Sequence, residues 1–156
     1  DDPRVRKYNN LDLSYSFEAP VSWRFTGRDA GFNMFSYNYK CKNVDTNCTG
    51  ANLLLLTSIT TGKKTALEWL TSKENILFPN SAKNTDKLPK LNIGGTEAVK
   101  VKDGGTSETY IFVFNDTVFM MSFGASNGTD AGRAKKVFDQ IISSFQTIDP
   151  VTGEIN

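Results

Sequence analysis

The 156-residue sequence contains no histidine. This absence excludes Ser-His-Asp and Cys-His nucleophilic catalysis, imidazole metal ligands and His-ligated haem. Carboxylate catalysis would have to use glutamates such as Glu68, Glu74, Glu97 and Glu108. None of these glutamates lies in a run of sequence that resembles a cleft. We therefore predict a protein that is not an enzyme, and a carboxylate-based hydrolase is the remaining enzymatic alternative.

The chain also lacks long hydrophobic runs and an excess of charge of one sign. Its longest aliphatic run is Leu53–Leu56, whereas a membrane-spanning helix needs roughly 20 apolar residues. The 18 basic and 17 acidic side chains give a formal net charge of +1, too little for a global field that attracts nucleic acid or an anionic bilayer. The lysine pairs Lys63-Lys64 and Lys135-Lys136 are interpreted as ordinary solvated surface.

Cysteine is scarce as well, since Cys41 and Cys48 are the only two. They flank a polar stretch between two predicted strands, where a disulfide would stabilise the fold by roughly 2–3 kcal/mol. Such a bridge implies an oxidising compartment, and two free thiols are the alternative. A zinc site is less favoured because no histidine completes the ligand set.

The segment between the cysteines also imitates a calcium loop. Asp45–Gly50 resembles the opening of a helix-loop-helix site, but position twelve would be Leu56 instead of glutamate, and strands flank the segment. The glycine pairs at 94–95 and 104–105 lack the strand-to-helix setting of a phosphate-binding loop. We therefore predict that the protein uses no metal and no cofactor.

Apolar residues alternate with polar ones from Leu11 to Phe25, apart from Pro20, which predicts a half-buried strand that bends at the proline. The first ten residues are polar and unpatterned, and are predicted to be a tether. Further strands are expected at 32–39, 51–60, 91–102, 109–114 and 118–124. The domain is predicted to span 11–149, with a C-terminal tail at 150–156.

Two helices are expected. Thr65 and Glu68 form a capping box at the start of the first, whose buried face should include Ile76 and Leu77 and whose pattern ends before Pro79. The second helix should bury a stripe consisting of Ala134, Val137, Phe138, Ile141, Ile142 and Phe145. The strands at 109–114 and 118–124 are apolar on both faces, so the sheet needs a layer above and a layer below. These elements predict a single α+β domain around an antiparallel sheet.

Candidate contact and modification residues lie mostly around the cysteines. Tyr37 and Tyr39 would form a contact patch if their strand lies near a sheet edge, and the alternative is that both are half-buried strand residues. The segment between the cysteines, with Asp45 and Asn47, is the first candidate for a partner contact. Acceptor sequons for glycosylation occur at Asn47, Asn115 and Asn127.

An ordered set of motifs resembles the PsbP family. The set comprises Tyr15-Ser-Phe17-Glu-Ala-Pro20-Val-Ser-Trp23, Ala66-Leu-Glu-Trp69-Leu, the strand from Gly94-Gly95 to Val101, a hairpin of aromatic strands and the helix end Ile142-Ser-Ser-Phe145. The resemblance spans residues 11 to 145. It implies an α/β/α sandwich whose mainly antiparallel central sheet is flanked by helices. It also implies an extrinsic, membrane-peripheral accessory domain without catalytic activity, and the cysteine-flanked segment lies outside the family pattern.

Together these features predict a non-enzymatic, extracytoplasmic accessory domain that binds a protein partner and does not bind nucleic acid. The alternative is a small-ligand or lipid carrier domain of a cell-envelope protein. The sequence opens on Asp1-Asp2-Pro3 without methionine, and we expect a mature or truncated product of a cell-envelope, secreted or lumenal protein tethered through its N-terminal segment.

Overall fold

A computed structural model describes residues 4–21, 23–29, 32–37, 52–103, 108–125, 131–149 and 151–155. Its strands are β1 (Val5–Asn10), β2 (Tyr15–Pro20), β3 (Trp23–Asp29), β4 (Phe32–Tyr37), β5 (Asn52–Thr60), β6 (Lys90–Ile93), β7 (Thr96–Lys100), β8 (Glu108–Phe114), β9 (Thr117–Ala125) and β10 (Gln146–Thr147). Its helices are α1 (Ala66–Leu70), α2 (Pro79–Ala82), a 3-10 turn η1 (Thr85–Lys87) and α3 (Ala131–Ser144).

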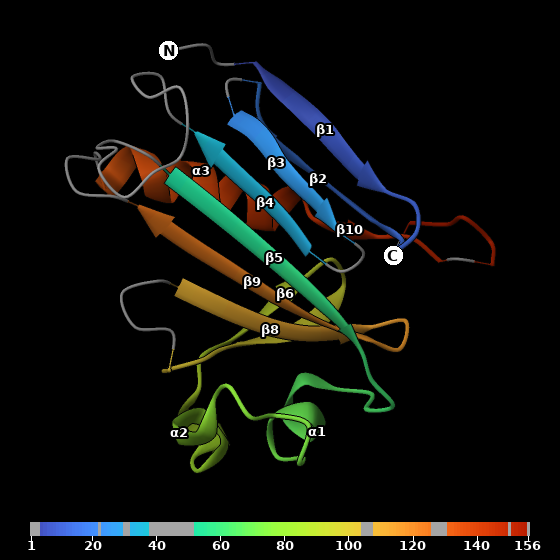
Figure 1. The fold of residues 1–156 in the computed structure, drawn as a ribbon, viewed down its shortest axis with the longest axis vertical. Coiled ribbons are helices and arrows are strands. Elements are labelled where there is room, and N and C mark those ends of the chain that lie inside the picture. The colour runs from blue at the N-terminus through green and yellow to red at the C-terminus, as the bar shows by residue number, and fades with distance from the viewer. Residues whose placement is uncertain are drawn as a thin grey trace.

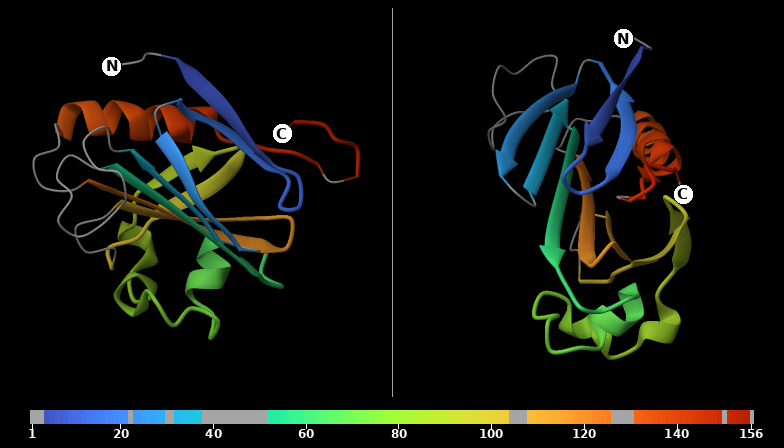
Figure 2. Two further views of the ribbon diagram at one scale, coloured as in Figure 1. Left: turned by 45° about the horizontal axis from the view of Figure 1, so that its top comes forward. Right: turned by 90° about the vertical axis from the view of Figure 1, so that its right-hand side faces the viewer.

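The described strands form a 7-stranded sheet in the order β3-β4-β5-β9-β8-β7-β6 and a 3-stranded sheet in the order β1-β2-β10, and every strand pair is antiparallel. Figures 1 and 2 show α3 on one side of the large sheet and α1 and α2 on the other. The small sheet lies on the α3 side, where β2 contacts α3. The predicted α+β class and the helix-flanked antiparallel sheet are therefore confirmed.

The two central strands β8 and β9 supply side chains to two separate cores, as their patterns predicted. One core lies beneath α3 and β2 and takes Phe112, Phe119 and Met121 from these strands. The other lies beneath α1 and takes Ile111 and Val118. Alternate side chains of a strand point to opposite faces of the sheet, so each strand stabilises both layers at once.

The alternating stretch from Leu11 to Phe25 is not one strand, contrary to the prediction. Residues 11–14 form a turn with Leu11 82% exposed, β2 then joins the small sheet, and β3 joins the large one. Pro20 is the last residue of β2, and the next amide, that of Val21, still donates to the Arg4 carbonyl at 3.1 Å. Tyr15, Phe17 and Trp23 are all buried, so the alternation correctly identified core residues on two sheets.

The polar segment before Leu11 is also more structured than predicted. Residues Val5–Asn10 form β1 and pair in register with β2, from Val5 opposite Pro20 to Asn10 opposite Tyr15. The side chains of β1 are exposed or half-buried, which explains why the sequence shows no apolar alternation there. β1 is an edge strand of the small sheet, and its backbone pairing with β2 holds it in place without an apolar face.

The helix predicted to extend toward Pro79 ends at Leu70, and Ile76 and Leu77 are not buried. The hydroxyl half of the capping box is present, since the Glu68 amide donates to Thr65 Oγ1 at 3.1 Å, whereas the Glu68 carboxylate accepts from the Lys64 amide, one residue before the cap. Thr71 and Ser72 then hydrogen-bond back to the carbonyls of the last helical turn and end the helix. The segment that follows contains α2 and η1. None of the described helices is long and apolar enough to cross a membrane.

Candidate functional site

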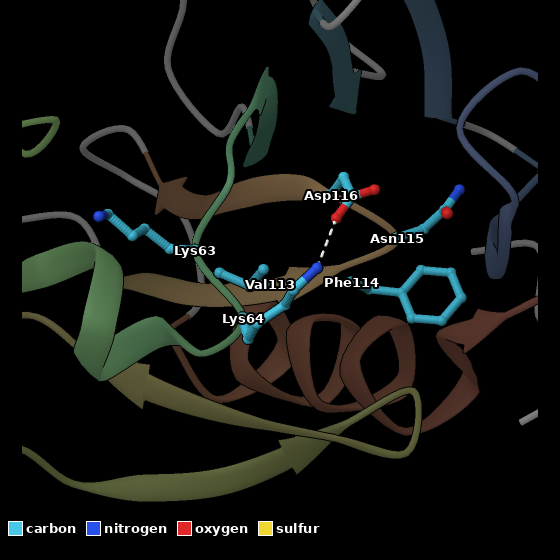
Figure 3. A pocket seen from close by; sticks show the side chains of 6 residues that line it. All are labelled: Lys63, Lys64, Val113, Phe114, Asn115 and Asp116. Carbon is cyan, nitrogen blue, oxygen red and sulfur yellow. Dashed lines mark hydrogen bonds and ion pairs between the residues drawn. The ribbon is translucent and has the colours of Figure 1, made fainter.

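A shallow hollow of about 330 Å³ lies where the connection from β5 to α1 meets the β8–β9 turn. Figure 3 shows its lining, which comprises Lys63, Lys64, Val113, Phe114, Asn115 and Asp116. The floor is apolar, because Val113 is buried in the core and Phe114 is half-buried. The rim carries the two lysines together with the polar residues of the turn.

The β8–β9 turn owes its shape to Asn115 and Asp116, whose φ angles are +50° and +55°. Two consecutive positive φ angles define the tight hairpin turn that matches the twist of the flanking strands, and asparagine and aspartate tolerate this region better than most residues. Thr117 Oγ1 donates to the Asn115 carbonyl at 3.1 Å. The turn therefore presents both polar side chains at a defined place on the rim.

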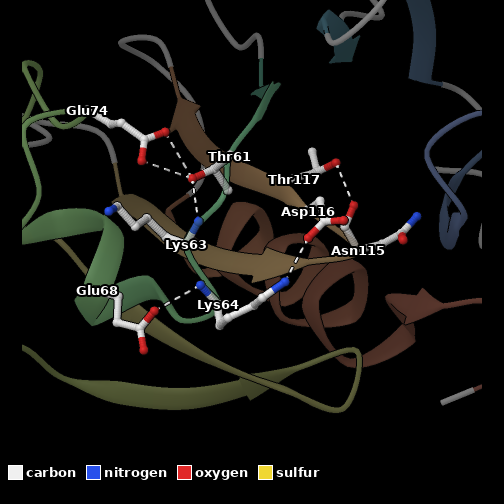
Figure 4. Close-up of polar contacts among 8 residues, drawn as sticks. All are labelled: Thr61, Lys63, Lys64, Glu68, Glu74, Asn115, Asp116 and Thr117. Carbon is white, nitrogen blue, oxygen red and sulfur yellow. Dashed lines mark hydrogen bonds and ion pairs between the residues drawn. The ribbon is translucent and has the colours of Figure 1, made fainter.

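Thr61 organises the opposite side of the hollow (Figure 4). Its buried hydroxyl donates to the Glu74 carboxylate, with the nearer oxygen at 3.0 Å, and accepts from the Lys63 amide at 3.0 Å. Its own amide donates to the Asp116 carbonyl at 2.8 Å, which joins the two sides. The Lys64 amide donates to Glu68 Oε2 at 3.0 Å, so the capping glutamate also positions this lysine.

Two of the charges on the rim form an exposed ion pair. Lys64 Nζ lies 3.0 Å from Asp116 Oδ1, with the two side chains 74% and 66% exposed. An ion pair this exposed contributes at most about 1 kcal/mol to stability, so its main effect is to orient the two groups. Among the described residues, no three Asp, Glu, Cys or His side chains gather as a metal site. The geometry of the rim suits hydrogen bonding and ion pairing with a polar partner group.

A second polar cluster joins α2 to the end of β7. Asp103 accepts hydrogen bonds from the Asn80 and Ser81 amides at 2.9 and 2.7 Å and from the Ser81 hydroxyl. Burial alone would raise the pKa of the Asp103 carboxyl, but these hydrogen bonds outweigh it, and the pKa lies below its ordinary value. The fully buried Ser81 hydroxyl also accepts from the Lys102 amide, so this cluster stabilises the fold and is closed to a substrate.

A third cluster lies on β8. Burial, and secondarily the charge of Glu108, raises the pKa of Tyr110 to about 12. The Tyr110 hydroxyl donates to Glu108 Oε2 at 3.2 Å, and Glu108 Oε1 lies 3.3 Å from Lys100 Nζ. The tyrosine is therefore held neutral in a small charged network on the sheet.

Of the residues that the sequence singled out, the structure brings only Asn115 to the hollow. Tyr37 is the last residue of β4, one strand in from the β3 edge of the large sheet. The other predicted contact, disulfide and glycosylation residues lie outside the described part of the chain; they are Tyr39, Cys41, Asp45, Asn47, Cys48 and Asn127.

No pattern in the sequence indicated the hollow, and Lys63-Lys64 fits ordinary solvated surface equally well. The sequence feature that could have indicated the hollow is the presence of two short polar connections that meet in the fold. Residues 61–65 precede a capping box, and Asn115-Asp116 separates two apolar strands. Their meeting depends on β5 pairing with β9, from Asn52 opposite Ala125 to Thr60 opposite Thr117. No local pattern in the sequence encodes that pairing.

Comparison with protein families finds no matching profile, and comparison with curated proteins finds no match. Solved structures do match. The solution structure of cyanobacterial PsbP (CyanoP) from Synechocystis sp. PCC 6803 superposes with a TM-score of 0.56 at 13% identity, over 92% of this chain and 92% of that one. The chain has a PsbP-like fold. The predicted resemblance is thereby confirmed at the level of the fold.

A crystal structure from Bacteroides thetaiotaomicron VPI-5482 matches equally well, with a TM-score of 0.56 at 17% identity over 96% of this chain. This chain spans about half the length of that protein, since the match covers 50% of it. The PsbP-like fold thus occurs both as a protein of similar length to this chain and as part of a longer one. At these identities the likeness concerns the fold alone.

Within the PsbP-like fold, the motifs that carried the resemblance are packing residues. Tyr15 and Phe17 stack on Phe145 with ring centroids 5.2 and 6.1 Å apart. Trp23 and Trp69 are buried in the two opposite cores. These side chains are enclosed by the domain itself, so they explain its architecture and leave any binding role to the surface.

Proposed function

We propose that this chain is a non-enzymatic accessory domain that acts outside the cytoplasm by binding another protein. The observation that carries the proposal is the match to cyanobacterial PsbP over 92% of both chains. The PsbP resemblance implies an extrinsic, membrane-peripheral domain without catalytic activity. The charged, open rim of the hollow supports a contact with polar groups of a partner.

The carrier alternative receives less support from the described residues. A small-molecule carrier encloses its ligand in a mostly apolar cavity. The hollow instead is open, and Lys63, Lys64, Asn115 and Asp116 supply most of its lining. The space between the sheet and α3 is filled by side chains such as Phe112, Phe119 and Phe145. Phe112 stacks on Phe119 with ring centroids 5.1 Å apart, and both meet Phe145 edge to face at 5.2 and 6.5 Å.

The experiment that tests the proposal is affinity capture from the cell-envelope fraction of the source organism. Three single variants should be compared with the wild type: Lys64→Gln at the hollow, Tyr39→Ser and Asp45→Asn at the predicted contact segment. Lys136→Gln on α3, which does not line the hollow, is the control for loss of one lysine. We expect one envelope protein to be enriched by the wild type and by K136Q, and to be reduced in at least one of the three variants. Equal enrichment by all five chains would overturn the proposal.

The proposed compartment has its own test. A bridge between Cys41 and Cys48 is proposed to form outside the cytoplasm, where disulfides persist. Thiol titration of natively isolated, denatured protein without reductant should find no free thiol. Two free thiols per chain would remove the argument for an oxidising compartment, while leaving the fold and the partner-binding proposal to be judged by the capture experiment. Glycan analysis at Asn47, Asn115 and Asn127 would test whether the three sequons are used.

A further inference from the structure

The connection between α1 and α2 exposes two consecutive aliphatic side chains. Ile76 is 82% exposed and Leu77 is 54% exposed, whereas Leu70 and Phe78 on either side are buried. Figure 2 shows this connection at the end of the molecule away from α3. Two adjacent large aliphatic residues in water indicate a surface that contacts something apolar, since scattered single residues would need no such explanation.

Hydrogen bonds hold this connection in one conformation. The Asn75 side chain donates to the Leu70 carbonyl at 2.8 Å and to the Phe78 carbonyl at 3.1 Å, and accepts from the Phe78 amide at 2.9 Å. The Asn75 amide donates to the Ser72 carbonyl, and the Glu74 side chain is held by Thr61. The turn that exposes the two aliphatic side chains therefore has a defined conformation. The Leu70 and Phe78 carbonyls and the Asn75 and Phe78 amides are already hydrogen-bonded within it.

Because its backbone groups are hydrogen-bonded, the turn can contact an apolar surface at a lower free-energy cost. Entering the apolar boundary of a bilayer is costly for amide and carbonyl groups without partners. Asn75 removes part of that cost next to Ile76 and Leu77 by pairing the flanking carbonyls within the turn. The arrangement suits shallow insertion of two side chains below the headgroups.

The charge around the connection is positive, although the chain as a whole is almost neutral. Residues 61–90 contain six lysines and three acidic side chains, a net charge of +3, while the rest of the chain contains twelve basic and fourteen acidic side chains, a net charge of −2. Lys73, Lys83 and Lys87 are exposed in this layer. Asp116 offsets Lys64 and Asp103 is balanced by the adjacent Lys102, so the layer stays positive.

From these observations we propose that the α1–α2 layer docks on an anionic lipid bilayer, with Ile76 and Leu77 inserted and the surrounding lysines facing the lipid headgroups. Charge complementarity selects the occupant, since a positive layer with a small aliphatic tip fits a negatively charged interface. Docking of this kind is reversible, because two side chains bury too little area for permanent anchoring. The proposal does not depend on the proposed protein partner, because Ile76, Leu77 and Lys73 lie outside the hollow, which shares only Lys63 and Lys64 with the positive layer.

Co-sedimentation with phosphatidylcholine vesicles, with and without phosphatidylglycerol, tests the proposal. We expect the wild-type chain to partition onto the anionic vesicles and to be released by high salt. The double variant Ile76→Ser/Leu77→Ser should bind at least roughly tenfold more weakly. Lys73→Gln should bind about fivefold more weakly, because one lysine near an anionic surface contributes on that scale.

Matched control variants distinguish binding through this surface from non-specific binding to vesicles. Leu11 is 82% exposed like Ile76 but lies at the β1–β2 turn, and Lys136 is an exposed lysine on α3. Leu11→Ser and Lys136→Gln should leave partitioning unchanged. No wild-type binding to anionic vesicles, equal binding to neutral vesicles, or equal losses in the controls would overturn the proposal. A double variant that binds vesicles normally but loses a captured envelope protein would also overturn it and reassign the turn to a protein contact.

Discussion

At the scale of single residues, Gly94 shows how a close approach selects glycine. It begins the turn between β6 and β7 with φ of +61°, and its carbonyl accepts from Thr147 Oγ1 at 2.8 Å. A Cβ atom there would lie 3.0 Å from a ring carbon of Phe145 and 3.3 Å from the Thr147 amide nitrogen. The position thus excludes side chains for two reasons, the left-handed backbone and the contact with β10.

Three glycine variants separate these two reasons. Gly62 has open space and no positive φ, Gly153 has φ of +74° with open space, and Gly94 has both a positive φ and close neighbours. We expect Gly62→Ala to leave the free energy of unfolding nearly unchanged and Gly153→Ala to lower it by about 1 kcal/mol. Gly94→Ala should lower it further, because Phe145 must also move.

Urea denaturation monitored by circular dichroism measures all three variants. Equal losses for Gly94→Ala and Gly153→Ala would show that the contact with Phe145 costs nothing and that the backbone conformation alone selects glycine at Gly94.

At the scale of elements, α2 is held by a side chain far away in the sequence. The helix has only four residues, and its cap residue Phe78 provides no side-chain hydrogen bond. Asp103, which follows β7, accepts from the first amides of the helix instead and holds the Ser81 hydroxyl. A negative charge at a helix N-terminus also interacts favourably with the unpaired amides there.

We expect removal of this clamp to destabilise the protein. Ser81→Ala should lower the free energy of unfolding by about 1–3 kcal/mol at neutral pH, because buried partners lose a hydrogen bond. The folded-state pKa of Asp103 is below its ordinary value of 3.8, so its contribution is fully present above that pH and is lost as the pH falls through the folded value.

The pH dependence is checked by comparing wild type with Asp103→Asn. The stability difference between them in urea denaturation should be largest near neutral pH and should shrink as the pH falls below 3.8. Asp86→Asn, in the exposed turn η1, controls for the loss of one negative charge near α2. A difference between wild type and D103N that stays constant down to acid pH would contradict the role of the ionised carboxylate.

At the scale of the whole molecule, the two cores share the strands β8 and β9. Residues that point to α3 and residues that point to α1 alternate along the same backbone, so one core cannot unpack without releasing the strands that support the other. The small sheet is linked as well, through the Ile148 amide to the Ser14 carbonyl and through the bridge from Gly94 to Gln146.

This architecture predicts a single cooperative unfolding transition. Ile141 and Ile111 are both fully buried, one in each core, and form a matched pair. Each Ile→Val change should cost about 1 kcal/mol and lower the same transition. Calorimetry checks this expectation, and two separable transitions, with each variant moving only one of them, would show that the layers unfold independently.

Local patterns were sufficient wherever a segment packs with one stripe or one face. The alternation in β8 and β9, the stripe of α3 through Phe138 and Ile141, which Phe145 continues just after the helix, and the Thr65 cap all follow from spacing. The same patterns failed where long-range contacts decide whether a residue with the right spacing lies in a strand or helix, or in a turn or connection. Leu11 fits an alternating strand but lies in a turn, and Ile76 fits a helical stripe but lies in a connection held open by Asn75.

The sequence by itself therefore determined the fold class, many residues of both cores and the absence of histidine chemistry, because these depend on composition and on periods of two and 3.6 residues. Only the tertiary structure decided which strands share a sheet, that β1 covers β2, and that Thr61 and Asp116 meet at one hollow. Long-range strand pairing brings such residues together, and no local period in the sequence records it.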